Sequence, residues 1–287
     1  MNRLLCICKK MICLHFIILM IFSFSTMIVM AQSTDQKKKT YLSKPLVTHI
    51  YTADPSAHLF NGKIYIYPSH DTAMGLPEDD EGGHFNMMDF HILSMDAIGG
   101  KVTDHGVGLT IKNIPWAKRQ LWAPDAAYAN NTYYLFFPVK DTADIFKIGV
   151  ATSTKPEGPF KAEPNPIKGS YSIDPAVFKD VDGNFYMYFG GVWGGQLQRW
   201  DNNEYHANAP LKKTSGKAIE PRVAKLSKDL KSFDGAVKEI KILDANGKEF
   251  NEENKKKSKT ESFIDDFEKK HPEVKRAVVN SLLELYK

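Results

Sequence analysis

The chain has 287 residues, with 38 lysines and arginines against 34 aspartates and glutamates, and a formal charge of +4. Three of the cations, Arg3, Lys9 and Lys10, lie in the first ten residues, and their removal leaves 35 basic and 34 acidic residues. A charge balance this close to neutral gives no reason to expect a nucleic-acid partner.

Residues 1–31 have the pattern of a secretory signal peptide. A basic start precedes an apolar stretch over Met11–Met30, and Ala31 supplies the small residue at which signal peptidases cut. The alternative is an uncleaved membrane anchor, because about 20 apolar residues can span a bilayer. All three cysteines lie in this segment, so the mature chain would have no disulfide and no cysteine-based metal site. We expect a secreted or periplasmic protein that has no membrane partner after cleavage.

Residues 32–43 form a polar leader, and residues 44–250 have the pattern of an all-β domain. Short aromatic and β-branched runs, such as Tyr133–Phe137 and Phe185–Phe189, alternate with Gly, Asn, Asp and Pro. No long stretch of helical periodicity appears between Tyr41 and Leu243.

An internal repeat divides this domain. An aspartate, a short apolar strand, a tight turn and an aromatic strand follow one another from Asp54, from Asp125 and from Asp174. The dipeptides Asn61-Gly62 and Asp182-Gly183 are strong hairpin signals. Small sheets repeated at this length stack radially, as in a β-propeller, where the innermost strand of each blade lies near the axis. We therefore expect the three aspartates to share one axial pocket. The alternative is that they only cap turns or strands of the repeat.

Five segments carry or flank this repeat: Ala53-Asp54-Pro55, Tyr67-Pro68-Ser69-His70-Asp71, Leu121-Trp122-Ala123-Pro124-Asp125, Tyr171-Ser172-Ile173-Asp174-Pro175 and the run from Gly190 to Leu197. Together these motifs resemble glycoside hydrolase family 43. The resemblance extends from about Lys44 to about Gly247, and it implies a five-bladed β-propeller of which about three blades are present. It also implies an inverting glycosidase for arabinose- or xylose-containing, plant-type oligosaccharides or polysaccharides, such as a β-xylosidase, an α-L-arabinofuranosidase or an arabinanase.

The resemblance assigns roles to several residues. Asp54 matches the general base, and Asp174 matches the residue that raises the pKa of the acid and orients the sugar. Inversion needs a base and an acid about 6.5–9.5 Å apart, so that a water molecule fits beside the sugar. We expect no cofactor, although a structural calcium at the propeller axis is compatible with the resemblance. The residues expected to bind substrate are Trp122, Asp125, His70, Trp193 and Gln196, with core filling as the alternative role for the two tryptophans.

The family pattern stops after about Glu249. A fourth repeat should open there with a glutamate, the family's general acid, but residues 251–287 instead combine a charged linker with a helix-like tail. Glu261 is the one candidate acid near the expected place. The sequence leaves two explanations open, a truncated reading frame with an unrelated end or a divergent protein with a foreign tail.

Three functions fit these observations. The first is a family 43 hydrolase impaired by loss of the general acid and of the last blades. The second is a non-catalytic carbohydrate-binding protein, and the third is an inactive fragment. Under the first hypothesis we expect little or no release of 4-nitrophenol from 4-nitrophenyl α-L-arabinofuranoside or β-D-xyloside, since general acid assistance is worth about 10²–10⁴ in rate.

Overall fold

The computed structural model describes residues 45–72, 75–79, 81–209 and 218–249. The chain divides into two compact units, residues 1–46 and 47–287, and the fold and the site lie in the second. The expected signal peptide, most of the leader, the linker and tail over 251–287, and Glu261 fall outside the described residues.

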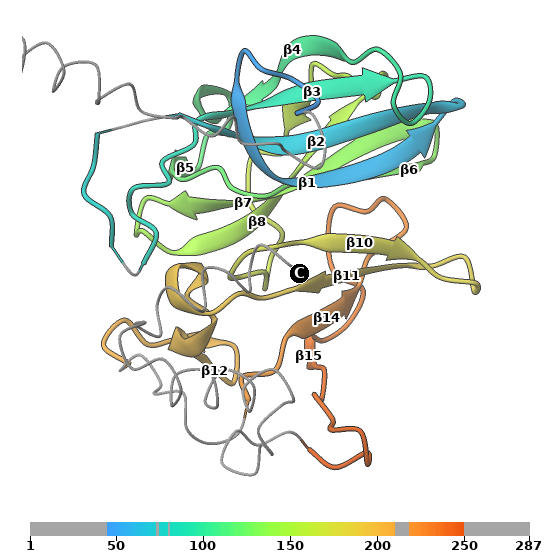
Figure 1. Cartoon of the computed structure of the whole chain (residues 1–287). Coiled ribbons are helices and arrows are strands. Elements are labelled where there is room, and N and C mark those ends of the chain that lie inside the picture. The colour runs from blue at the N-terminus through green and yellow to red at the C-terminus, as the bar shows by residue number, and fades with distance from the viewer. Residues whose placement is uncertain (1–44, 73–74, 80, 210–217, 250–287) are drawn as a thin grey trace, which may run out of the picture. The chain divides into compact units, whose positions relative to one another are not determined.

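The described residues form an all-β structure with no α-helix, which confirms the predicted fold class (Figure 1). Three antiparallel sheets follow one another along the chain, and we call them blades I, II and III. Blade I consists of β1 (Tyr51–Phe60), β2 (Lys63–Asp71), β3 (Asp89–Met95) and β4 (Thr103–Thr110), in that order.

Blades II and III continue this pattern with small additions. In blade II, both β5 and β6 pair with β7, and in blade III a small hairpin, β12–β13, lies in the connection between β11 and β14. The strands of blade II are β5 (Ala117–Arg119), β6 (Asp125–Ala129), β7 (Thr132–Asp141), β8 (Phe146–Ser153) and β9 (Lys161–Ala162). Those of blade III are β10 (Ala176–Lys179), β11 (Phe185–Phe189), β14 (Arg222–Lys225) and β15 (Lys238–Glu239), and the hairpin is β12 (Trp200–Asp201) and β13 (Glu204–Tyr205). Three 3-10 turns complete the described structure, η1 (Ile111–Asn113), η2 (Trp193–Gly195) and η3 (Leu197–Arg199).

Tight turns fix the register of the inner hairpins. Phe60 pairs with Lys63 around Asn61-Gly62, whose φ angles of 50° and 76° are both positive. Such two-residue turns match the right-handed twist of the strands they join, which is why Asn and Gly are favoured there. The predicted hairpin at Asn61-Gly62 is confirmed, and a second one turns at Asn130 and Asn131 between β6 and β7.

Blade II is buried on both faces. Tyr133, Leu135 and Phe137 of β7 belong to the core shared with blade I, whereas Tyr134 and Phe136 belong to the core shared with blade III. Successive side chains of a strand point to opposite faces, so a strand between two apolar layers has an uninterrupted apolar sequence. This explains the aromatic run that the sequence shows here.

Within the described part of the chain, no helix is long and apolar enough to cross a membrane.

Candidate active site

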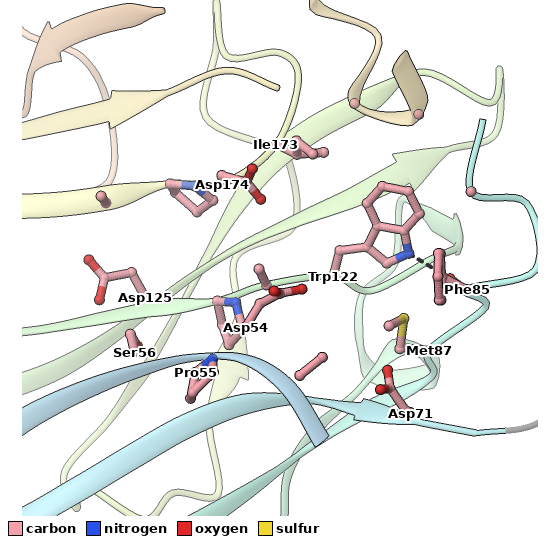
Figure 2. A pocket seen from close by; sticks show the side chains of 18 of the residues that line it. Asp54, Pro55, Ser56, Asp71, Phe85, Met87, Trp122, Asp125, Ile173 and Asp174 are labelled. Atoms are coloured by element: carbon pink, nitrogen blue, oxygen red, sulfur yellow. Dashed lines mark hydrogen bonds between the residues drawn. The ribbon is translucent and has the colours of Figure 1, made fainter. Parts of the chain in front are cut away.

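A pocket of about 850 Å3 opens where the inner strands of the three blades meet. Asp54 of β1, Asp125 of β6 and Asp174, two residues before β10, all line it. Figure 2 shows Asp54, Asp71 and Asp174 on the wall of the same pocket as the indole of Trp122. The predicted convergence of the three repeated aspartates on one pocket is therefore what the structure shows.

A β-bulge directs Asp54 into this pocket. Ala53 pairs with Ser69 and Ser56 pairs with Tyr67, so two residues of β1 stand opposite one residue of β2. Asp54 takes the left-handed conformation, with φ of 46°, immediately before Pro55. For a residue with a side chain this conformation costs on the order of 1 kcal/mol, and bulges beside active sites commonly redirect a side chain.

Asp174 lies in the same left-handed conformation, with φ of 58°, and also precedes a proline. A glycine-rich loop packs against it, since a Cβ added to Gly191 would come within 2.6 Å of Ile173 and 3.3 Å of a carboxylate oxygen of Asp174. Ser172 fixes this loop, because its hydroxyl accepts the Gly191 N–H at 2.9 Å and donates to the Gly195 carbonyl at 2.7 Å. The glycines therefore allow the loop to support the Asp174 carboxylate closely.

The pocket raises the pKa of two of its carboxyl groups. Burial raises the pKa of Asp174, and the negative charge of Asp54 raises it further. Burial also makes the largest contribution to the raised pKa of Asp71. The charge of Asp54 raises this pKa further, whereas the neighbouring His70 lowers it. Both side chains contact the open pocket, but the chain packed behind them displaces water that would otherwise solvate the charge. Clustered carboxyl groups with perturbed pKa values are a feature of acid–base sites.

Trp122 joins the pocket wall to the loop that precedes β3. Its Nε1–H donates to the Phe85 carbonyl at 2.6 Å, drawn in Figure 2, and its ring lies 4.7 Å from that of Phe146. A Cβ added to Gly82 would lie 2.9 Å from the indole, so the loop approaches the ring closely. Asp79, Gly82 and Phe85 of this loop line the pocket together with Trp122, which the sequence predicts to bind substrate.

The chain is similar in sequence and structure to known proteins. The family model for glycosyl hydrolases family 43 matches residues 44–247. The chain belongs to glycosyl hydrolases family 43. It is 56% identical over 207 residues to a xylosidase/arabinosidase 43A from Humicola insolens, and 54% identical over 204 residues to a xylosidase/arabinosidase from Bacteroides ovatus. These matches cover 69% and 71% of this chain, and 63% of each relative.

Solved structures of the family agree with this assignment. A β-xylosidase/α-arabinofuranosidase of family 43 from a compost microbial metagenome, solved in complex with xylotriose in a calcium-free form, superposes with a TM-score of 0.70 at 62% sequence identity. That match covers 72% of this chain and 64% of the other. The predicted β-propeller of the family 43 type is confirmed, and the chain spans less than two thirds of the length of these relatives.

Asp125 lines the pocket, but its carboxylate is occupied by the protein. One oxygen lies 2.6 Å from Nε2 of His58 on β1 and accepts the Ala126 N–H at 2.8 Å. The other oxygen accepts the Val177 N–H of β10 at 2.6 Å. Asp125 thus connects the inner strands of all three blades, and its substrate-binding role stays a prediction.

Three other predicted substrate-binding residues do not line the pocket. His70 neighbours Asp71 on β2, so its side chain points to the opposite face of the sheet, where it lies 2.6 Å from Asp89. Gln196 is buried, with its amide joined to the Phe146 N–H and the Asp144 carbonyl, both in blade II. Trp193 is 47% exposed and lies outside the lining, between the lining residues Val192 and Gly194. The predicted catalytic roles of Asp54 and Asp174 stay predictions.

Asp71, Phe85 and Met87 also line the pocket, and none of them was among the predicted site residues. Oδ1 of Asp71 is buried and has no hydrogen-bond partner among the described residues. A signal for Asp71 was present, because the turn at Asn61-Gly62 sets the hairpin register and places the end of β2 beside the start of β1, where Asp54 lies. No comparable signal marked Phe85 or Met87, which lie between strands.

A structural calcium at the propeller axis, which the resemblance allows, receives no support from the carboxylates of this pocket. Calcium takes six to eight oxygen ligands. Within the described part of the chain, the carboxylates of the pocket form no group of three close enough together to hold a metal ion, and those of Asp125 already accept hydrogen bonds. The described carboxylates of the pocket therefore do not form a calcium site by themselves.

The charge of Asp54 gives a testable effect on its neighbours. Replacing Asp54 with asparagine should lower the pKa of both Asp174 and Asp71, since it removes a negative charge that disfavours their ionised forms. Carbon-13 NMR titration of the carboxyl carbons measures both values. Asp96→Asn, which changes an exposed carboxylate on the far end of blade I, is the control. An unchanged pKa for Asp174 in Asp54→Asn would contradict the electrostatic coupling of the two carboxylates.

Proposed function

We propose that the pocket is the site of an inverting glycosidase that hydrolyses O-glycosyl bonds of xylose or arabinose residues, with Asp54 as the general base. The observation that carries the proposal is the meeting of Asp54 and Asp174, from blades I and III, on one pocket in which each carboxylate faces the same space. The charge of Asp54 also helps to keep the Asp174 carboxyl protonated to higher pH.

The chemistry requires a carboxylate that takes a proton from water as the water attacks the anomeric carbon. Asp54 is exposed to the pocket, so a water molecule can reach it. Asp174 supplies a carboxyl group with a raised pKa, and Asp71 supplies a buried oxygen that has no partner among the described residues. Both groups can form hydrogen bonds with sugar hydroxyl groups. The Trp122 indole supplies an apolar face on which a sugar ring can stack.

The proposed specificity for xylose and arabinose is supported by the relatives of this chain. The two xylosidase/arabinosidases that share more than half of the matched residues with this chain are named for xylose and arabinose, and the metagenomic enzyme was solved with xylotriose. A substrate of plant-type polysaccharide also suits an exported protein, and the signal-like residues 1–31 support a secreted or periplasmic location.

The stereochemistry of the product tests this proposal. We expect the chain, at high protein concentration with 4-nitrophenyl β-D-xyloside, to release α-xylose first, as followed by the anomeric proton signals in NMR. The aryl group leaves with little help from an acid, so the test does not depend on Glu261. Release of β-xylose first would show retention and would contradict the assignment of Asp54. Binding of xylotriose in calorimetry without any turnover would favour the carbohydrate-binding alternative.

A further inference from the structure

A cluster of histidines and aspartates lies on blade I, on the face of the sheet opposite to the pocket. His70 of β2 and Asp89 and His91 of β3 each offer one ligand atom, and these atoms lie within 4.8 Å of one another. The rings of His70 and His91 are 4.6 Å apart between centroids and inclined at 60°. Their side chains are 16–24% exposed, so the cluster is shielded but can be reached from solvent.

The strands place these residues on one face. Along β3, Phe90 and Ile92 enter the core shared with blade II, while Leu93 and Met95 belong to a separate apolar cluster with Ile66 of β2. Because side chains alternate along a strand, Asp89 and His91 share the face of Leu93 and Met95. The cluster is thus built on two adjacent paired strands, which hold ligands more rigidly than loops do.

Asp104 orients His91 and is itself held in place by two other groups. Nδ1 of His91 lies 3.1 Å from Oδ2 of Asp104 on β4, so Nε2 is the atom that remains for a ligand. Asp104 is itself fixed, since it accepts the Gly106 N–H at 2.7 Å and lies 2.7 Å from Nε2 of His49. Metal-binding histidines almost always donate their other ring N–H to a carboxylate, a backbone carbonyl or water, and this bond fixes the tautomer and the direction of the ring.

His70 and Asp89 form the other half of the cluster. Nδ1 of His70 and Oδ1 of Asp89 are 2.6 Å apart, the distance of a strong hydrogen bond. A metal ion between these two atoms would replace the hydrogen that they share, and the ring would carry its proton on Nε2 instead. This pair needs only a small movement, because two ligands of one metal ion lie about 3 Å apart when each is about 2 Å from it. The ligand atoms of the whole cluster lie up to 4.8 Å apart, so the His91 ring must move closer to the pair.

We propose that His70, Asp89 and His91 bind a divalent transition-metal ion, for which zinc is the best-fitting occupant. Two imidazole nitrogens and one carboxylate oxygen favour zinc over calcium, which selects all-oxygen ligands. With three protein ligands, a fourth position remains for water. The ion would link β2 to β3 directly behind the strand end that carries Asp71, and so stabilise one wall of the pocket.

Zinc binding by the chelator-treated full chain tests this site. We expect calorimetry with zinc chloride to show one more bound ion for the wild type than for His91→Ala, and the melting temperature of the wild type to rise with zinc concentration. His206→Ala, which removes an exposed histidine on blade III, should bind as the wild type does. The difference in stoichiometry separates this site from any zinc held by Cys6, Cys8 and Cys13.

Asp104→Asn serves as a second variant, because it leaves the three ligands in place. We expect it to retain the ion with an affinity lowered about 10- to 100-fold, as when a supporting carboxylate is removed. Equal zinc stoichiometry in the wild type and in a folded His91→Ala, or equal stabilisation by calcium chloride and zinc chloride, would overturn the proposal. If His91→Ala fails to fold, Asp89→Asn replaces it in the same comparison, with the same two outcomes.

Discussion

Replacing Asp54 with asparagine should lower the low residual rate at which this chain releases 4-nitrophenol from 4-nitrophenyl β-D-xyloside by about 10²–10⁴. Asparagine has nearly the same shape as aspartate but cannot accept a proton from the attacking water. Asp54 also occupies a bulge and a left-handed backbone conformation, both of which asparagine tolerates, so the pocket should keep its form. Initial rates at high protein concentration measure the effect.

The control for this loss is Asp96→Asn, in which an exposed carboxylate paired with Lys63 is removed from the same blade. It should keep the rate of the wild type. Azide added to Asp54→Ala provides an independent check, because it can attack the sugar without a base and should restore turnover while forming the inverted glycosyl azide. Turnover that persists in Asp54→Asn would mean that another carboxylate of the pocket, such as Asp71 or Asp174, is the base.

The sequence was sufficient to predict the features that repeat along the chain. Each blade contains the same order of strand and turn, so the convergence of Asp54, Asp125 and Asp174 follows from the architecture once the repeat is found. The tight turn at Asn61-Gly62 was predictable for the same reason, since positive φ at both residues strongly restricts which residues occur there.

Side-chain direction and partners were less predictable. His70 and Asp71 are adjacent in one quoted motif, and only strand register decides that Asp71 faces the pocket and His70 the opposite side. Gln196 follows the glycine-rich loop at the pocket, but its amide is taken by backbone groups of blade II, which lie about 50 residues earlier in the chain. Contacts of this kind depend on the packing of the blades, and a local motif does not contain them.

The partners of Asp125 could not be predicted from a local motif either, and their loss should lower the stability of the fold. The repeat correctly placed it at the pocket, yet the groups that occupy its oxygens, His58 and the Val177 N–H, belong to the two neighbouring blades. Replacing Asp125 with alanine should therefore lower the free energy of unfolding by about 3 kcal/mol, because two donors at the junction of the blades lose their acceptor. For a chain of this size the melting temperature should fall by roughly 6–12 °C.

Urea denaturation followed by circular dichroism measures this loss, with Asp96→Ala as the control. That variant removes only an exposed ion pair with Lys63 and should leave the free energy of unfolding nearly unchanged. Asp125→Asn should fall between the two, because its carbonyl oxygen can still accept the Val177 N–H while its amide group meets the Ala126 N–H unfavourably. If Asp125→Ala were as stable as Asp96→Ala, the blades would not depend on this carboxylate. Its oxygens would then be available for a sugar, as the substrate-binding role predicted from the sequence requires.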